Sequence, residues 1–321
     1  MSTARPCAFG KVPHVGDFIR ARADLPPIPT FEAWVTDGMG SAHSRRPAWA
    51  QEFGRGAPYA FVYRPPAKSP QGTLLVGVMR PSHDAVGRLF PLVFGAVTEA
   101  APFASAPHLL PLVLGDFLEL AGHASLRADA ITQPQQLEAH VASLNPPMFD
   151  ARAAYYDYSA FSQQTGVGGA LSAIYGESWS FRAPHAVHTI VEALKPVRGR
   201  EPPDTRLSLR LPLGVAGTAA VAFWLDVVRA AGAWQRTVPT FFWCADDSSG
   251  SLLLQLGDTP QSSLSELWSP DDNADLVCDL VASTTTINPS RSLEALPRNV
   301  AAALYSPITP VSAFVDALAH S

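Results

Sequence analysis

The chain has 321 residues, of which 47% are hydrophobic and 16% charged, so it can bury a sizeable core and is not a disordered polyampholyte. Its 23 basic and 28 acidic residues include no long basic run, which argues against a surface for nucleic acid or anionic lipid. The most apolar stretch, residues 215–225, stops at Asp226, short of the roughly 20 residues that span a bilayer.

The first predicted helix follows Pro29, with Thr30 as its N-cap. Its apolar residues recur at helical spacing and should pack on a sheet: Phe31, Trp34, Val35, Gly38, Met39 and Ala42. Three candidate strands follow, at residues 59–63, 73–79 and 89–97, each rich in aromatic or β-branched residues and bounded by Pro and Gly. Consecutive strands of this kind favour an antiparallel meander.

The second half alternates further helices and strands. Helices are predicted at 111–122, where Gly122 would cap the end, from Pro134 onward, and at 219–231. Strands are predicted at 189–194, near 207–211, and at 238–244 and 252–256, whereas 166–169 reads as a flexible turn. The mixture of helices and strands along the chain favours a layered α/β fold built around a mixed sheet.

The final residues differ in composition. From 269 onward Ser, Thr, Pro and Asp increase, and two short helices are predicted at 298–304 and 311–318. We therefore divide the chain into an α/β domain at 1–268 and an appended C-terminal segment with short helices at 269–321.

Cys7, Cys244 and Cys278 are odd in number and widely spaced, which fits neither a disulfide framework nor a paired zinc motif. A reducing compartment, the cytoplasm, is the simpler inference. The glycine cluster at 166–169 lacks the lysine of a phosphate-binding loop, so we expect no nucleotide cofactor. His185, His188 and Glu192 include an i, i+4 pair that could hold a metal on a helix. On a strand His188 and Glu192 would be too far apart for one ion and would form a solvated polar edge, and we expect no metal.

A first unusual segment spans residues 9–18. Between two aromatic residues it holds glycines, a proline, a cation and a carboxylate, a composition typical of an ordered recognition loop: Phe9, Gly10, Lys11, Pro13, Gly16, Asp17 and Phe18. A purely structural loop is the alternative.

A second segment spans residues 80–92. Asp84 and Arg88 are spaced to pair across a tight turn closed by Gly87, as a structural clamp or as a binding feature. Ser82, His83 and Asp84 are the residue types of a catalytic triad, but sequence neighbours cannot converge as one, and Ser and Asp also bond nearby amides in turns.

These two segments resemble the motifs of one protein family, the type VI secretion system-associated TagF (ImpM) proteins. The first motif is Gly10-Lys11-x-Pro13-x-x-Gly16-Asp17-Phe18, followed by Leu25-Pro26, Phe31 and Trp34. The second is Pro81-Ser82-x-Asp84-x-Val86-Gly87-Arg88-x-Phe90-Pro91-Leu92. The aromatic run Phe241-Phe242-Trp243 also resembles the later part of these family members, more weakly than the two motifs do.

The resemblance implies a cytoplasmic accessory protein that restrains type VI secretion after translation and has no catalytic residues. It further implies a three-layer α/β/α sandwich around a mixed, largely antiparallel sheet, and a forkhead-associated scaffold protein as the partner. The residues that would bind this partner, or carry the motifs, are Gly10, Lys11, Pro13, Gly16, Asp17, Phe18, Trp34, Pro81, Ser82, Asp84, Gly87, Arg88, Phe90 and Pro91.

Two alternatives stay open from the sequence. The first is an enzyme of the same pathway, a hydrolase or metal-dependent phosphatase, with Asp17, His83, Asp84 and Arg88 gathered at one cleft. The second is a scaffold whose motifs only hold the fold together while the partner binds elsewhere, for instance on the C-terminal segment.

Overall fold

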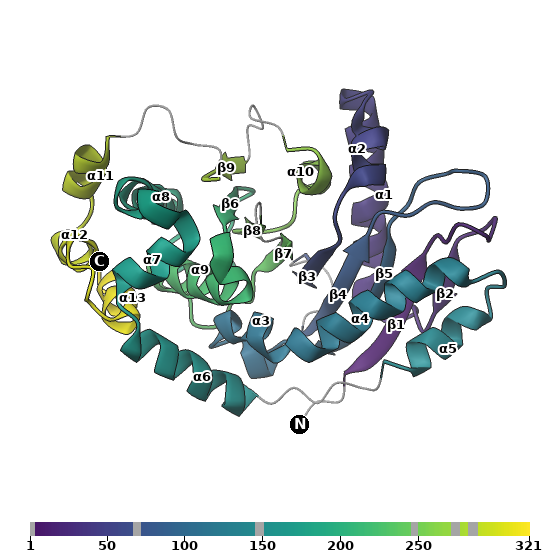
Figure 1. Cartoon of the computed structure of the whole chain (residues 1–321), viewed down its shortest axis with the longest axis horizontal. Coiled ribbons are helices and arrows are strands. Elements are labelled where there is room, and N and C mark those ends of the chain that lie inside the picture. The colour runs from purple at the N-terminus through teal and green to yellow at the C-terminus, as the bar shows by residue number, and fades with distance from the viewer. Residues whose placement is uncertain (1–3, 67–71, 145–150, 245–249, 271–276, 282–287) are drawn as a thin grey trace.

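A single open sheet runs through the protein in the computed structural model, which describes residues 4–66, 72–144, 151–244, 250–270, 277–281 and 288–321. Figure 1 shows the N-terminal half on the right and the C-terminal helices on the left. Within the described residues the sheet has nine strands in the order β2-β1-β5-β4-β3-β7-β8-β6-β9. The strands are β1 Arg5–Gly10, β2 Ile19–Ala21, β3 Tyr59–Tyr63, β4 Thr73–Arg80, β5 Leu92–Glu99, β6 Ser208–Pro212, β7 Thr240–Cys244, β8 Ser251–Gln255 and β9 Val277–Asp279.

The predicted meander of β3, β4 and β5 is confirmed. Its register pairs Tyr63 with Leu75 and Gly77 with Gly95. β3 also pairs antiparallel with β7, so the two halves of the chain share one sheet. β6 and β9 form a parallel pair, whereas the other described pairs are antiparallel. The sheet is therefore mixed and largely antiparallel.

One face of the sheet is covered by α1 (Pro27–Arg45), α2 (Trp49–Arg55) and α10 (Ser265–Trp268). The predicted apolar face of α1 packs there, with Phe31 stacked 5.0 Å from Phe61 and Trp34 5.2 Å from Phe242 between ring centroids. These rings belong to one buried cluster, so aromatic burial fixes α1 on the sheet.

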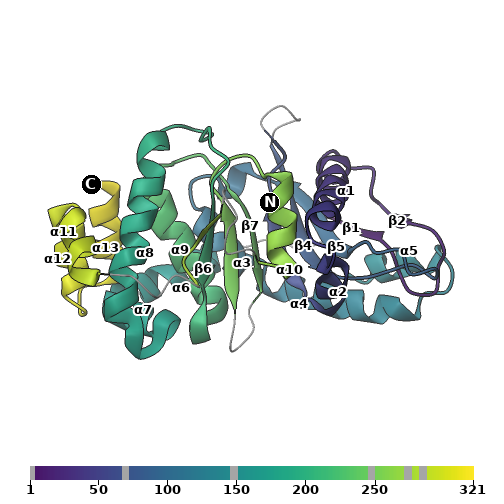
Figure 2. The same cartoon turned by 90° about the horizontal axis from the view of Figure 1, so that it is seen from above.

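The opposite face is covered by α3 (Leu110–Val113), α4 (Gly115–Arg127), α5 (Gln136–Ala142) and α9 (Gly217–Gly232). Outside them lie α6 (Ala151–Gln164), α7 (Val167–Tyr175) and α8 (Trp179–Leu194). Figure 2 shows the order in the C-terminal half, from β6 and β7 outward through α9 to α8. The three-layer α/β/α sandwich is thus confirmed, with additional helices on its second face.

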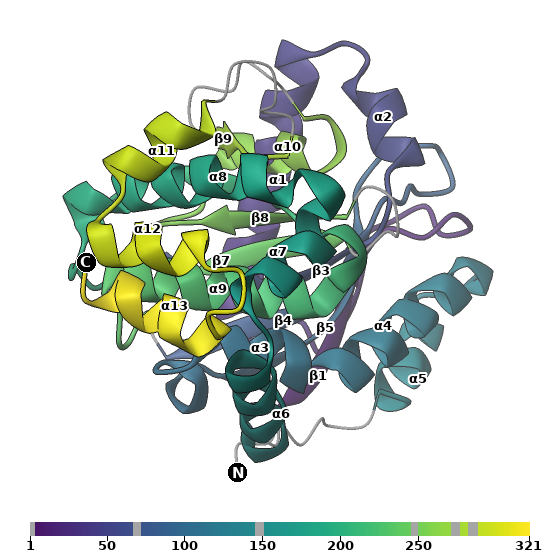
Figure 3. The same ribbon diagram turned by 60° about the vertical axis from the view of Figure 1, so that its left-hand side comes forward.

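Residues 288–321 form α11 (Pro289–Ala295), α12 (Arg298–Tyr305) and α13 (Val311–Ala319), which confirms both predicted C-terminal helices. Figure 3 shows the three in front of α8 and α9. Val311, Phe314 and Leu318 are fully buried in the same cluster as Trp224 of α9. The division into a domain at 1–268 and an appended segment at 269–321 stays a prediction.

Four local predictions were wrong, the first of them at the start of α1. α1 begins at Pro27, because proline has no amide N–H to leave unpaired in the first turn, and the Thr30 hydroxyl donates to the Pro26 carbonyl instead of capping. Gly122 lies inside α4, since the apolar face continues through Ala124 to Ala128. Residues 189–194 are helical within α8.

The error in α8 has a physical reason. Ala183, Val187, Ile190 and Leu194 recur at helical spacing and are all fully buried, but Pro184 interrupts this pattern in the sequence while lying inside the helix. The glycines at 166–169 likewise do not form a flexible turn: Gly166 caps α7 and Gly168 lies in its first turn, where a Cβ would come within 2.5 Å of the Pro307 side chain.

The residues from Gly214 to Gly232, which include α9, are long and apolar enough to cross a membrane by composition. However, 61% of their most apolar window is buried inside the protein, as in the core helix of a soluble fold. We treat α9 as a core helix for that reason.

Candidate functional site

The two motif segments lie side by side at one end of the sheet. β1 and β5 pair antiparallel, with Phe9 opposite Val93, so residues 11–18, which leave β1, emerge beside residues 81–91, which lead into β5. Gly10 permits this close approach, because its φ is +134° and a Cβ would lie 2.3 Å from the Pro91 carbonyl oxygen. We call residues 11–18 and 81–91 together the paired loops.

The Asp84 carboxylate is the centre of the paired loops. Its side chain is fully buried, and its Oδ2 lies 3.0 Å from Lys11 Nζ and 2.7 Å from Arg88 Nε. Oδ1 accepts hydrogen bonds from the Val86 amide at 3.1 Å and the Arg88 amide at 2.9 Å. The predicted pair of Asp84 and Arg88 therefore forms, across a turn in which Gly87 has a φ of +84°.

The carboxylate is held in its charged form. Burial by itself would raise the pKa of Asp84, but hydrogen bonds from the Arg88 amide, the Lys11 ammonium, the Arg88 guanidinium and the Val86 amide outweigh it and hold the pKa well below its usual range. Because four donors bond to the buried Asp84 carboxylate, these charge-assisted bonds hold the two loops in one geometry.

Further hydrogen bonds join the two segments, including one from the Lys11 ammonium to the Arg88 carbonyl at 3.3 Å. The Ser82 hydroxyl donates to the Lys11 carbonyl at 2.8 Å, and the Ala85 amide donates to the Val15 carbonyl at 3.1 Å. Arg88 Nη2 donates to the Gly16 carbonyl at 2.5 Å. Since each bond crosses between the segments, the two sequence motifs form a single structural unit.

An aromatic contact extends the unit toward α1. The rings of Phe18 and Phe90 meet edge to face at 4.9 Å, and the Arg20 guanidinium lies 4.4 Å above Phe18. Arg20 also forms a 2.8 Å ion pair with Glu32 of α1. Trp34 lies apart from the paired loops, where its indole Nε1 donates to the Pro260 carbonyl at 2.9 Å.

The predicted site residues divide into two groups by exposure. Those that hold the unit together are buried or partly buried: Gly10, Lys11, Pro13, Phe18, Pro81, Ser82, Asp84, Phe90 and Pro91. Gly16, Asp17, Gly87 and Arg88 are exposed. The Asp17 carboxylate makes no hydrogen bond or ion pair within the part of the chain that the structure describes.

Val86 was missed as a site residue. Its side chain is 72% exposed at the tip of the second loop, between the anchored Asp84 and Arg88. A valine in a turn beside Gly87 is the sequence signal that could have identified it, because a branched apolar residue is not needed to form such a turn. We define the paired-loop surface as Gly16, Asp17, Val86 and Arg88.

The positions of Asp84 and His83 also argue against acid–base or metal catalysis at this site. Both Asp84 oxygens are occupied by donors, and the exposed His83 ring has its Nδ1 3.0 Å from the Asp84 carbonyl, so these residues do not converge on a reacting atom. Among the described residues no group of three or more His, Cys, Asp and Glu side chains could hold one metal ion. That the chain is not an enzyme stays a prediction.

The stretch of chain that holds both motifs matches a known family model. Residues 7–144 match the family model described as the TagF N-terminal domain, type VI secretion system-associated. Among functionally characterised proteins, none shows significant similarity to the chain. A crystal structure of PA0076 from Pseudomonas aeruginosa PAO1 superposes with a TM-score of 0.49 at 16% identity, covering 88% of this chain and 100% of that one. That likeness is too weak to support an argument, whereas the family match spans both motifs.

Proposed function

From the match of residues 7–144 to the TagF N-terminal domain, we propose how this chain acts within type VI secretion. We propose that it is a post-translational repressor in the cytoplasm, which binds a forkhead-associated scaffold component through the paired-loop surface. Binding would occupy the scaffold and so restrain assembly or firing of the apparatus.

The exposure of Asp17, Val86 and Arg88 on one rigid unit is the observation that supports the proposal most strongly. The ion pairs of Asp84 and the cross-loop hydrogen bonds hold these residues in place before any partner binds. A preorganised surface loses little conformational entropy on association. An exposed valine on the same unit as an exposed carboxylate and guanidinium also matches the pattern of an apolar anchor with a polar rim.

The scaffold alternative makes a different prediction for the same residues. If the motifs only stabilise the fold, then altering an exposed residue such as Val86 leaves both folding and repression intact. The Val86 amide, not its side chain, bonds to Asp84, so Val86→Asp keeps the clamp while placing a charge at the tip. This variant therefore separates binding from stability.

The test is a secretion assay in a host with an active type VI system. Production of the wild-type chain is expected to reduce the release of a secreted tube component, and Val86→Asp is expected to restore release at equal protein level. Arg55→Ala, an exposed change at the end of α2 ahead of β3, three strands away from β1, is the matched control and should repress as wild type does. Full repression by Val86→Asp would overturn the proposed surface.

A further inference from the structure

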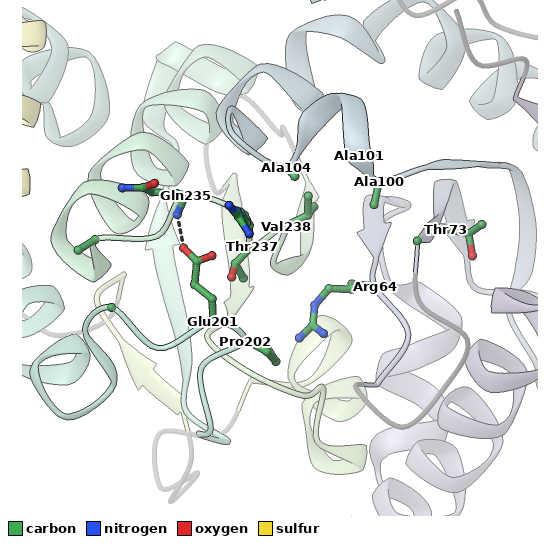
Figure 4. Close-up of a pocket in the computed structure, with 14 residues that line it drawn as sticks. Arg64, Thr73, Ala100, Ala101, Ala104, Glu201, Pro202, Gln235, Thr237 and Val238 are labelled. Atoms are coloured by element: carbon green, nitrogen blue, oxygen red, sulfur yellow. Dashed lines mark hydrogen bonds between the residues drawn. The ribbon is translucent and has the colours of Figure 1, made fainter.

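A cleft of about 660 Å³ lies at the end of the sheet opposite the paired loops. One side of the cleft is formed by Arg64 after β3, Thr73 at the start of β4 and Ala100 after β5. The other side is formed by the connections that follow α8 and α9. Figure 4 shows the Arg64 side chain directed toward Glu201, with Gln235 and Thr237 lining the same side as Glu201. The two halves of the chain thus both line this cleft.

The backbone of Arg64 is fixed in the cleft, but its guanidinium group is only partly hydrogen-bonded. Its amide donates to the Thr240 hydroxyl at 3.0 Å, and its carbonyl lies 3.3 Å from the same hydroxyl, which fixes the backbone. The guanidinium is 12% exposed, and its Nη2 lies 3.4 Å from the Gly257 carbonyl and 3.7 Å from an Asp258 carboxylate oxygen. Nε and Nη1 have no acceptor among the described residues.

Two arginines and one carboxylate line the cleft: Arg64, Arg236 and Glu201. Arg236 is exposed and forms no hydrogen bond or ion pair with the described residues. The carboxylate of Glu201 already accepts the main-chain N–H of Gln235. Burial lowers the pKa of Arg64, although the Asp258 carboxylate opposes this, so holding the guanidinium charge here is costly and an anion would offset that cost.

We propose that this cleft binds a small organic anion, whose carboxylate or phosphate oxygens accept hydrogen bonds from the guanidinium groups of Arg64 and Arg236. The volume lies within the range of about 300–1,000 Å³ that small-molecule sites occupy. Arginine is suited to the role, since its planar fork bonds carboxylate and phosphate oxygens in pairs. The site is separate from the paired-loop surface and goes beyond the proposed repression.

Isothermal titration calorimetry of the full chain with citrate and, separately, with pyrophosphate tests the proposal at low ionic strength. At least one of the two anions should bind with saturable heat at one site per chain, and the stronger binder identifies carboxylate or phosphate as the preferred group. Arg64→Gln and Arg236→Gln should each weaken that binding by at least about tenfold, because each removes a charge-assisted hydrogen bond.

Two controls keep the result decisive. Arg55→Gln changes an exposed arginine just before the opposite end of β3 and should bind the anion as wild type does. Arg236 is exposed, so Arg236→Gln retains the fold, as circular dichroism will verify, even where Arg64→Gln does not. Absence of saturable binding for both anions, or binding that Arg236→Gln leaves unchanged, would overturn the proposal.

Discussion

Within the two motifs, some residues hold the loops together and others are exposed on the surface. Asp84 is buried and bonded to both loops, whereas the side chains of Asp17 and Val86 are exposed and take no part in the clamp. The sequence allows the pairing of Asp84 with Arg88 to be predicted from their spacing around Gly87. It could not show that Lys11, 73 positions earlier, is the other partner of Asp84, because that contact depends on the pairing of β1 with β5.

Replacing Asp84 by asparagine should destabilise the protein strongly. Asp84→Asn removes the buried negative charge and leaves the mostly buried Lys11 ammonium without its counter-charge, which costs about 3 kcal/mol in the free energy of unfolding. Urea unfolding measures the change. Asp17→Asn, an equal loss of charge at an exposed position, is the control and should stay within about 0.5 kcal/mol of wild type. Equal effects of the two changes would contradict the clamp.

The same residue predicts a pH dependence. The pKa of Asp84 is lowered by folding from an unfolded value of about 3.9, so its contribution to stability is complete above about pH 5 and is lost as pH falls toward the folded pKa. The difference in unfolding free energy between wild type and Asp84→Asn should therefore shrink from pH 7 to pH 3. A difference that stays constant over this range would show that the charge of Asp84 is not what stabilises the loops.

The individual helices and strands were largely predictable where apolar periodicity is regular. The meander and the inward face of α1 follow from alternation and from helical spacing, and both are confirmed. Prediction failed at α8, where Pro184 masks the helical pattern, and at Gly122, where a glycine inside a helix resembles a cap. In both places tertiary packing of the apolar face outweighs the local signal.

The junction between β1 and β5 gives a prediction about an element boundary. Gly10→Ala places a Cβ 2.3 Å from the Pro91 carbonyl oxygen in a backbone region that favours glycine, so we expect a loss of at least about 2 kcal/mol in unfolding free energy. Gly16→Ala, which meets open space within the same motif, should change stability by less than about 0.5 kcal/mol. Chemical denaturation of both variants checks the pair, and a stable Gly10→Ala protein would refute the close approach.

For the whole molecule, the continuous sheet and the buried C-terminal helices indicate a cooperative unit. The composition of 269–321 predicts an appended segment, and Phe314 of α13 is fully buried in the cluster that contains residues of α9. The sequence could show that α13 is amphipathic, yet it could not show which helix receives its apolar face, since that contact spans most of the C-terminal half.

Phe314→Ala tests this cooperativity. The cavity should cost about 3–5 kcal/mol and lower the entire thermal transition, because α13 unfolds together with α9 and the sheet. Tyr305→Ala, at a side chain that is 82% exposed, is the control and should leave the transition unchanged. Calorimetry that resolved a separate, weaker transition for Phe314→Ala, with the main one unmoved, would favour an independent segment.

The proposal of repression depends on one contact, that of the paired-loop surface with a forkhead-associated scaffold. The measurement that tests it most directly is titration calorimetry of the purified scaffold with the wild-type chain and with Val86→Asp. We predict that wild type forms a complex and that Val86→Asp weakens it at least about tenfold, with an unchanged melting temperature and with Arg55→Ala binding as wild type does. A wild-type chain that does not bind, or a Val86→Asp chain that binds equally well, would contradict the account.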